Sequence, residues 1–369
     1  MVWAVVTGGG TSGHVIPAIA VIEMLEDSGV PTGEIAYVGS RRGVESRMIP
    51  ATGVRSAYLP ISGLQRSMSP RGILRNVALP WRLVRSTLMA RSLIRRWDPA
   101  VVVSVGGYAS EPMARAAVAR GVPLVCVSYD FVPGLATRRQ SRHATVCTVA
   151  FEGSELPRAV VTGAPVRRSV RTMDRGAMRG TCRAALGVEP EEILVTVVGG
   201  SLGSFALNNS VASVTAALSA AGIRARVRHV TGPRYGFTGA QTGADGVVVD
   251  AVAYEDDMPG LLAASDVLVS RAGASTVAEI ATLGVASVLV PWPGAADNHQ
   301  ARNAEWLARG GGAVVVEESA GLAGDLAGAV VELALDPQRR AAIGTAAREL
   351  GARNRSGALV DAIRNAALR

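Results

Sequence analysis

The sequence feature that most constrains the fold is a rhythm of short, valine-rich apolar runs separated by amphipathic segments. The rhythm occurs twice, with runs at 3–6, 35–38, 101–105, 124–127 and 160–162, and again at 194–198, 247–249, 267–269, 287–290 and 313–316. Runs that are apolar throughout are typical of strands buried on both faces, and their alternation with helical segments favours parallel sheets. The sequence therefore predicts two doubly wound α/β domains, a number that also suits a chain of 369 residues.

The clearest domain boundary lies in 163–171, where a strand ends in Gly and Pro and a charged helical segment follows. We place the junction near residue 167, which predicts domains of 1–167 and 168–350, with 351–369 as a terminal helix. Ligands of open α/β sheets bind beyond the carboxyl ends of the strands. We therefore expect a ligand cleft between the two domains.

The charge and the cysteines limit the classes of protein to consider. All 38 basic side chains are arginine, 30 acidic residues oppose them, and the net charge is +8. The three cysteines, Cys126, Cys147 and Cys182, have no metal-site spacing and favour a reducing compartment. The opening apolar run enters glycines at once and no run of 18 apolar residues follows, so neither secretion nor a membrane-spanning helix is implied.

The first motif that could carry chemistry is Thr7-Gly-Gly-Gly-Thr-Ser-Gly-His14, between a strand and a helix. Glycines let the backbone approach a ligand closely, and the N–H groups at a helix start favour an anion. A dinucleotide site fits poorly, because His14 and Pro17 intrude and no acidic residue follows at the ribose spacing. An imidazole at the mouth of a cleft could remove a proton from an acceptor hydroxyl, and the alternative is a histidine that only caps the turn.

Two motifs in the second half repeat this strand, turn and helix pattern. In the first, Gly199-Gly-Ser201, backbone N–H groups and a hydroxyl could meet a phosphate, although a purely structural turn is equally compatible. In the second, 266–279, a strand enters a turn of small residues that opens a helix beside Arg271, which suits a diphosphate. Glu279, one helical turn later, suits ribose hydroxyls, and the alternative is a surface glutamate paired with an arginine.

The fourth motif, 290–303, is a Pro/Gly loop followed by a helix for which Asp297 is the expected cap. His299, Gln300 and Asn303 project from the first turns of that helix. Amide side chains recognise sugar hydroxyls or an N-acetyl group by paired donor and acceptor bonds. The same residues could instead cap the helix and pair with the loop.

Taken together and in order, these motifs resemble the MurG family, which transfers N-acetylglucosamine from its UDP conjugate onto lipid I to make lipid II. The resemblance covers nearly the whole chain. Its landmarks are the glycine loop with His14, the Gly106-Gly-Tyr-Ala-Ser110 turn, the Gly163-Ala-Pro-Val-Arg167 junction, the Gly199-Gly-Ser201 turn, Asp256-Asp-Met258, Arg271-Ala-Gly-Ala-Ser-Thr276 with Glu279, and His299-Gln300 with Asn303.

The resemblance implies an α/β fold of GT-B type: two Rossmann-like parallel-sheet domains with a cleft between them, and a last helix, 351–369, crossing back to the first domain. It also implies an inverting transfer in peptidoglycan synthesis with UDP-N-acetylglucosamine and a lipid-linked acceptor as substrates, and without a cofactor or bound metal. Carried over by position, the residues that bind the donor are Ser201, Arg271, Ala274, Ser275, Thr276, Glu279, His299, Gln300 and Asn303. Those on the acceptor or diphosphate side are Thr11, Gly13, Tyr108, Asp130 and Arg167, with His14 as the candidate base.

Two positions depart from the family pattern. The family commonly shows His-Glu-Gln-Asn where this chain has Val127-Ser-Tyr-Asp130, and Gln where it has Leu202. Asp130 could do the acceptor-side work alone, or the chain could be a specialised glycosyltransferase with another acceptor. A non-catalytic nucleotide-sugar-binding membrane protein and a nucleotide-sugar epimerase are further alternatives.

Positive charge concentrates in 71–96, which holds seven arginines and no acidic residue. The arginines at 71, 75, 82, 85, 91, 95 and 96 interleave with Ile73, Leu74, Leu79, Trp81, Leu83 and Leu88. This pattern suits a surface that rests on anionic lipid headgroups, and it predicts a peripheral protein at the cytoplasmic face of the membrane. The alternative is a core-packed helix with a solvated basic face, and nucleic-acid binding is disfavoured because no reading motif is present.

Overall fold

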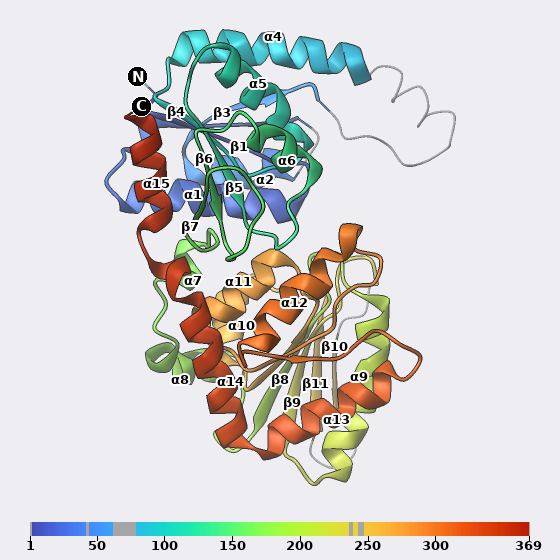
Figure 1. Cartoon of the computed structure of the whole chain (residues 1–369). Helices are drawn as coiled ribbons and strands as arrows, with labels where there is room; N and C mark the ends of the chain where they lie inside the picture. The colour runs from blue at the N-terminus through green and yellow to red at the C-terminus, as the bar shows by residue number, and fades with distance from the viewer. Residues whose placement is uncertain (1, 42–43, 62–78, 236–238, 243–246, 369) are drawn as a thin grey trace. The chain divides into compact units, whose positions relative to one another are not determined.

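A computed structural model describes residues 2–41, 44–61, 79–235, 239–242 and 247–368. The chain divides into two compact units (Figure 1). Unit 1 comprises Met1–Arg168 and Ser356–Arg369, and unit 2 comprises Ser169–Arg355. The terminal helix α15 (Ala358–Ala367) thus belongs to the same unit as the first half of the chain, and it contacts the strands of that unit.

Unit 1 is built on a seven-stranded sheet in the order β3-β2-β1-β4-β5-β6-β7, in which every neighbouring pair is parallel. The strands are β1 (Ala4–Thr7), β2 (Ile35–Ser40), β3 (Arg55–Leu59), β4 (Val101–Ser104), β5 (Leu124–Ser128), β6 (Val146–Val149) and β7 (Ala159–Val161). Because β1, β4 and β5 are neighbours and parallel, the loops that follow them emerge at the same edge of the sheet. This edge carries the candidate residues of unit 1.

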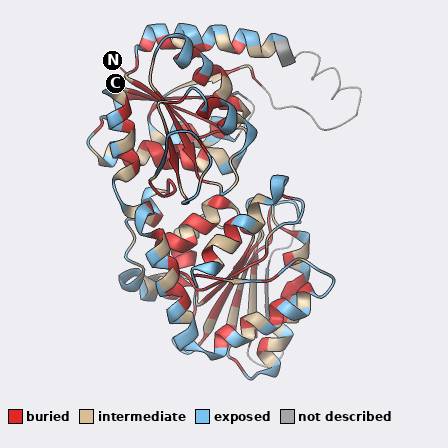
Figure 2. Cartoon of the chain, in the orientation of Figure 1, coloured by how far each residue is buried: buried red, intermediate tan, exposed pale blue. Residues whose placement is uncertain are grey.

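The helices of unit 1 are α1 (Ser12–Asp27), α2 (Glu45–Met48), α4 (Leu79–Trp97), α5 (Glu111–Ala119), α6 (Leu135–Ser141) and α15, with short 3-10 turns η1 (Thr32–Glu34), η2 (Ile49–Thr52) and η3 (Tyr108–Ser110). Helices α4 and α5 join a core with the sheet through Ala90, Ile94 and Met113, all of them buried. Figure 2 shows that the strands of this unit are mostly buried, whereas α4 has a broad exposed face.

Unit 2 has a second seven-stranded sheet in the order β10-β11-β9-β8-β12-β13-β14, and only the β10–β11 pair is antiparallel. The strands are β8 (Ile193–Val198), β9 (Ala225–Val230), β10 (Gly239–Thr242), β11 (Val247–Val252), β12 (Val267–Ser270), β13 (Ser287–Leu289) and β14 (Val314–Val315). The predicted pair of parallel α/β domains is therefore confirmed. All ten predicted runs are strands, and β3, β6, β9 and β10 are additional ones.

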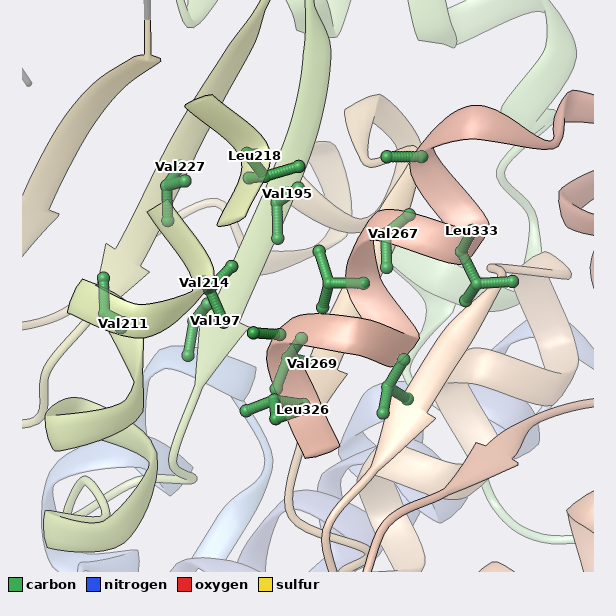
Figure 3. Packing of buried hydrophobic residues seen from close by; sticks show 14 of the residues in the cluster. Val195, Val197, Val211, Val214, Leu218, Val227, Val267, Val269, Leu326 and Leu333 are labelled. Carbon is green, nitrogen blue, oxygen red and sulfur yellow. The ribbon is translucent and has the colours of Figure 1, made fainter. Parts of the chain in front are cut away.

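The helices from the end of unit 1 through unit 2 are α7 (Arg168–Arg171), α8 (Arg175–Ala185), α9 (Phe205–Ala220), α10 (Met258–Ala264), α11 (Ala274–Leu283), α12 (His299–Arg309), α13 (Leu322–Leu335) and α14 (Pro337–Leu350), with 3-10 turns η5 (Ala296–Asn298) and η6 (Gly351–Arg355). Helices α9 and α13 pack beside each other on the sheet, where Val214 and Leu326 meet Val197 and Val269 (Figure 3). All four side chains are almost fully buried. This valine-rich core is the physical basis of the repeated apolar runs.

Arginines of α8 fix the turn that leads into β12. Arg179 and Arg183, one helical turn apart, both pair with the carboxylate of Asp266, at 2.6 and 2.8 Å. Arg175 donates to the carbonyl oxygens of Ser265 and Gly284 at 2.6 and 2.8 Å. Several of the arginines that make the chain basic therefore form ion pairs and hydrogen bonds within unit 2.

Candidate functional site

The glycine loop between β1 and α1 is held from inside unit 1. The N–H of Gly10 donates to Oε1 of Glu45 over 3.1 Å, and the hydroxyl of Tyr37 donates to the carbonyl of Gly8 over 2.7 Å. Glu45 and Tyr37 are both fully buried. Burial raises the pKa of Tyr37 far above its usual value, so the phenol stays protonated and remains a donor. The N–H of Gly10, which the glycine motif predicted as a donor to an anionic ligand, is thus already bound to the carboxylate of Glu45.

The turn after β4 lies directly against His14. Gly106 and Gly107 have φ values of 84° and 77°, a region that favours glycine. A Cβ at Gly107 would lie 2.5 Å from the carbonyl oxygen of Gly9 and 3.2 Å from Cγ of His14. The imidazole therefore packs directly against the backbone of Gly106 and Gly107, where no side chain intervenes. The structure thus brings together the two glycine motifs predicted in unit 1.

The remaining surroundings of His14 come from its own helix and from the end of β5. Its Nδ1 is 3.1 Å from the hydroxyl of Thr11, and its ring meets that of Tyr129 edge-on with centroids 6.3 Å apart. The Tyr129 hydroxyl donates to the carbonyl of Gly13 over 2.8 Å, which ties β5 to the first turn of α1. Burial lowers the pKa of His14, and the negative charge of Asp130 partly opposes this effect. A histidine that is neutral near pH 7 can accept a proton.

The structure treats the other two unit 1 candidates differently. Tyr108 packs against the glycine loop, since a Cβ at Gly10 would lie 2.3 Å from its ring. Arg167 instead pairs with Glu23 at 2.8 Å. Glu23 lies nine residues beyond His14 on α1, about 13 Å along the helix axis at about 1.5 Å per residue. The structure therefore does not bring Arg167 into the cluster around His14.

In unit 2, the turn after β8 is shaped by close backbone contacts. A Cβ at Gly203 would lie 2.1 Å from the carbonyl oxygen of Thr231, and one at Gly232 would lie 2.3 Å from the N atom of Gly203. Ser201, in this turn, is exposed. Ser204 caps α9, where its hydroxyl accepts the N–H of Leu207 over 3.4 Å.

The hydrogen-bond partners of Arg271 lie inside unit 2. It donates to Oγ of Ser204 over 2.7 Å, to the carbonyl of Val290 over 3.1 Å, and pairs with Glu318 at 2.5 Å. Its side chain is only 11% exposed. In this structure Arg271 ties together the ends of neighbouring segments, and its contact with a diphosphate stays a prediction.

The start of α11 has the form that the sequence predicts for an anion site. Its N-cap, Gly273, has no side chain to satisfy the first N–H groups of the helix, which belong to Ala274, Ser275 and Thr276. Ser275 and Thr276 are half-buried, and Glu279 is half-buried one turn further along the same helix. A diphosphate at this helix end would meet several N–H donors and the positive end of the helix dipole.

The three candidates on α12 have distinct partners. His299 donates from Nδ1 to the carbonyl of Ala296 over 2.7 Å, and Oε1 of Gln300 accepts the N–H of Trp292 over 3.0 Å. Asn303 is fully buried and donates to the carbonyl of Ala272 over 3.2 Å. Asn303 thereby supports the turn that precedes α11, a role that its position in the motif did not predict.

The predicted helix cap at Asp297 is wrong. Asp297 lies in the short 3-10 turn η5 with a φ of 53°, and the N-cap of α12 is Asn298, also with a φ of 53°. The side chain of Asn298 forms no capping hydrogen bond. Because Asp297 and Asn298 both lie in the left-handed region, regular helical backbone begins only at His299. Asn298 therefore takes the N-cap position in place of Asp297.

Sequence reasoning missed two buried polar residues that support the loops of unit 1. One is Glu45, and the other is Gln140 on α6, which accepts from Ser104 over 2.6 Å and donates to Ser110 and Glu111 over 2.9 and 3.1 Å. Ser104 in turn accepts the N–H of Gly106 over 3.3 Å. Both residues lie outside the glycine motifs, and only the three-dimensional contacts connect them to these motifs.

The two units, each a Rossmann-like sheet with glycine turns at its carboxyl edge, define a GT-B glycosyltransferase. Residues 4–149 match the glycosyltransferase family 28 N-terminal domain, and residues 194–357 match the glycosyltransferase family 28 C-terminal domain. A relative from Clavibacter sepedonicus, named UDP-N-acetylglucosamine--N-acetylmuramyl-(pentapeptide) pyrophosphoryl-undecaprenol N-acetylglucosamine transferase, is 36% identical over 97% of this chain and 95% of its own length. The chain belongs to this family, the MurG family.

Solved structures agree with this assignment. MurG of Acinetobacter baumannii is 25% identical with a TM-score of 0.75, over 99% of this chain and 100% of that one. A UDP-GlcNAc 2-epimerase from Neisseria meningitidis has a TM-score of 0.66 over 99% of this chain and 100% of that one. At 13% identity it shares the fold alone.

Proposed function

We propose that the chain transfers N-acetylglucosamine from UDP-N-acetylglucosamine to lipid I and so makes lipid II for peptidoglycan. The observation that carries the proposal is a half-buried histidine of α1, with a lowered pKa, packed against a glycine turn of unit 1 in a chain of this family. The two named substrates are those of the relatives' activity.

On the donor side, the start of α11 suits the diphosphate. The N–H groups of Ala274, Ser275 and Thr276 lack a side-chain cap and can bind phosphate oxygens. Glu279 suits the ribose hydroxyls, because a carboxylate accepts two hydrogen bonds at once. Gln300 suits the sugar through its amide nitrogen, since only its Oε1 bonds to Trp292. Ser201 is exposed beside the turn after β8 and can donate to a phosphate.

On the acceptor side, His14 is the proposed general base. With the Nδ1 hydrogen donated to Thr11, Nε2 takes the proton of the acceptor hydroxyl. The hydroxyl oxygen then forms its bond to C1 of the sugar from the face opposite the diphosphate. The C1–O bond to the diphosphate breaks, UDP leaves with the electron pair, and the configuration at C1 inverts. No metal or other cofactor takes part in the proposed reaction.

The proposed route to a lipid-linked acceptor is α4. Among the residues that the structure describes, no helix is both long and apolar enough to cross a bilayer. The outer face of α4 exposes Trp81 by 72%, Val84 by 52% and Leu88 by 58%. Arginines 82, 85, 91, 95 and 96 accompany these apolar side chains, whereas residues 71–78 of the predicted segment lie outside the described residues. The combination suits peripheral docking on anionic lipid at the cytoplasmic face of the membrane.

A second candidate function keeps the chemistry and changes the acceptor. The end of β5 carries Tyr129 and Asp130 where the family commonly has Gln and Asn, and the Tyr129 hydroxyl bonds to the first turn of α1. This substitution alters the side of His14 that an acceptor would approach. It favours a specialised glycosyltransferase over an epimerase or a silent binding protein, because it changes the surroundings of the base and keeps the base itself.

The test is transfer of labelled N-acetylglucosamine from UDP-N-acetylglucosamine to a lipid I analogue in vesicles, with His14→Ala as the paired variant. We expect labelled lipid II with the wild type and loss of transfer in the variant, with UDP binding retained. Transfer to a different acceptor from a panel, with lipid I left unchanged, would favour the specialised enzyme. UDP binding without transfer to any acceptor would contradict both proposals.

A further inference from the structure

Glu45 is a buried carboxylate that the proposed reaction does not use. It is the first residue of α2 and its exposure is 0%. Its Oε1 accepts two backbone hydrogen bonds, from Gly10 over 3.1 Å and from Ser40 over 3.0 Å, and its Oε2 lies 3.3 Å from the same N–H of Gly10. A carboxylate in this position is costly unless its oxygens are satisfied, so both contacts matter for the fold.

The contacts of Glu45 connect two strand ends of unit 1. Ser40 is the last residue of β2, and Gly10 belongs to the loop after β1. Gly10 has a φ of 98°, a value that favours glycine, and its N–H points to the carboxylate of Glu45. A Cβ at Gly9 would lie 2.6 Å from Oε1 of Glu45, so the loop backbone lies closely on the carboxylate. The loop rests on this side chain in the way that other glycine loops rest on a bound anion.

The residues just beyond this contact belong to the proposed site. Thr11 is the N-cap of α1, and its hydroxyl lies 3.1 Å from Nδ1 of His14. The carbonyl of Gly9 lies against the turn at Gly107, which also supports the imidazole. A shift of the loop at Gly9 and Gly10 would therefore move both supports of His14.

We propose that Glu45 is a positioning residue. Its hydrogen bonds fix the backbone of the glycine loop and thereby keep His14 in the orientation needed for proton abstraction. This inference rests on the proposed function of His14. It also implies that the N–H of Gly10 does not bind the acceptor diphosphate, because the carboxylate occupies that N–H. The remaining donors at the start of α1 would meet the acceptor instead.

Three variants distinguish the effect of side-chain length at position 45 from the effect of its negative charge: Glu45→Gln, Glu45→Asp and Glu45→Ala. Glutamine keeps an oxygen at the Oε1 position, whereas aspartate keeps the charge but is one methylene too short to bond both N–H groups. Leu156→Ala, in the core of the same unit and outside the segments proposed to bind substrate or membrane, is the matched control for stability alone. Stability is measured for each variant by urea unfolding, and UDP-N-acetylglucosamine binding by calorimetry.

We expect Glu45→Ala and Glu45→Asp to lower kcat by roughly 100-fold, the loss typical of a catalytic group displaced by about 1 Å. The KM for UDP-N-acetylglucosamine should stay within about twofold, and Glu45→Gln should recover most of the rate because its oxygen can accept both bonds. If Leu156→Ala lowers kcat as much at equal loss of stability, or if Glu45→Gln is as inactive as Glu45→Ala, the inference is overturned.

A second readout does not depend on turnover, so it separates failure of this inference from failure of the proposed function. The pKa of His14 is measured by NMR, with its signal assigned by comparison with His14→Ala. Burial lowers this pKa, so a loosened loop in Glu45→Ala should move it upward toward 6.5. The titratable groups next to the ring, Asp130 and Tyr129, are retained in every variant. An unchanged pKa in Glu45→Ala overturns the inference even if the lipid acceptor is wrong.

Discussion

The guanidinium of Arg271 and the hydroxyl of Ser204 lie 2.7 Å apart, and this bond joins the end of β12 to the start of α9. The same hydroxyl caps α9, and the other side of the guanidinium pairs with Glu318 and the carbonyl of Val290. One largely buried arginine therefore connects the turn after β8 with the turn before α11. These are the two segments of unit 2 proposed to bind the donor.

Arg271→Ala should destabilise unit 2 and weaken donor binding together. Removing one partner of a fully buried pair typically costs about 3–5 kcal/mol, and we expect about 2–3 kcal/mol here because Glu318 is 26% exposed and water partly screens its charge. Urea unfolding measures this loss. Arg309→Ala, which breaks an exposed pair with Glu305, is the control and should cost about 0.5 kcal/mol or less. Equal losses in the two variants would contradict the bridging role of Arg271.

Activity should fall at low pH along a limb set by His14. Its pKa lies below 6.5 because of burial, and the rate is lost as the ring gains a proton. The charge of Asp130 raises that pKa, so Asp130→Asn should move the limb to lower pH. The measurement is the pH profile of kcat, with Glu155→Gln as a control that should leave it unchanged. Movement of the limb to higher pH in Asp130→Asn would refute the electrostatic assignment.

His229 should make unit 2 sensitive to acid. It is 5% exposed, its Nε2 lies 3.0 Å from Oδ1 of Asn208, and burial lowers its pKa to about 4. Between pH 6.5 and about 4 the unfolded chain binds a proton that the folded chain does not, so stability falls as the pH falls through this window. The full effect is about 3 kcal/mol at about 1.36 kcal/mol per pKa unit.

The check on His229 is urea unfolding at a series of pH values for the wild type and for His229→Gln, whose amide can still reach Asn208. The wild type should lose more stability than the variant between pH 6.5 and 4. Parallel curves for the two proteins would show that His229 is not responsible.

Leu88→Glu should weaken binding to anionic vesicles by about tenfold or more, because burial of a leucine in lipid contributes about 1.5–3 kcal/mol. Leu88 is 58% exposed on α4, so its replacement should leave stability and UDP binding unchanged. Leu335→Glu, at a position of unit 2 that is 61% exposed, is the matched control. Vesicle sedimentation measures the difference, and equal binding by both variants would argue against α4 as the docking surface.

Gly107→Ala should abolish activity and lower stability by more than backbone strain alone. The Cβ would lie 2.5 Å from the carbonyl oxygen of Gly9 and 3.2 Å from the ring of His14. Gly187→Ala is the matched control, because Gly187 also has a positive φ but no atom within 4 Å of the added Cβ. It should cost only about 1 kcal/mol of strain. A comparison of unfolding and transfer rates for the two variants tests the close contact.

Much of the fold could be predicted because apolar runs buried on both faces leave a local signal. The missed strand β9 shows the limit of that signal, since Arg226 and Arg228 interrupt its apolar positions. Both side chains form ion pairs, Arg226 with Glu192 and Arg228 with Glu255, so the strand can be half-buried with charges on one face. These partners are distant in sequence and no periodicity reveals them.

The sequence by itself determined the two α/β units, the family, and which turns are rich in glycine, because backbone freedom and apolar burial are written in short stretches of chain. Only the tertiary structure decided which polar side chains within those turns are already engaged. Arg271, Asn303 and Arg167 were expected to be ligand-binding groups, and the structure gives each of them a partner inside its own unit. Hydrogen-bond partners far apart in sequence come together only in the fold. For the same reason, only the three-dimensional contacts showed that Glu45 supports the glycine loop.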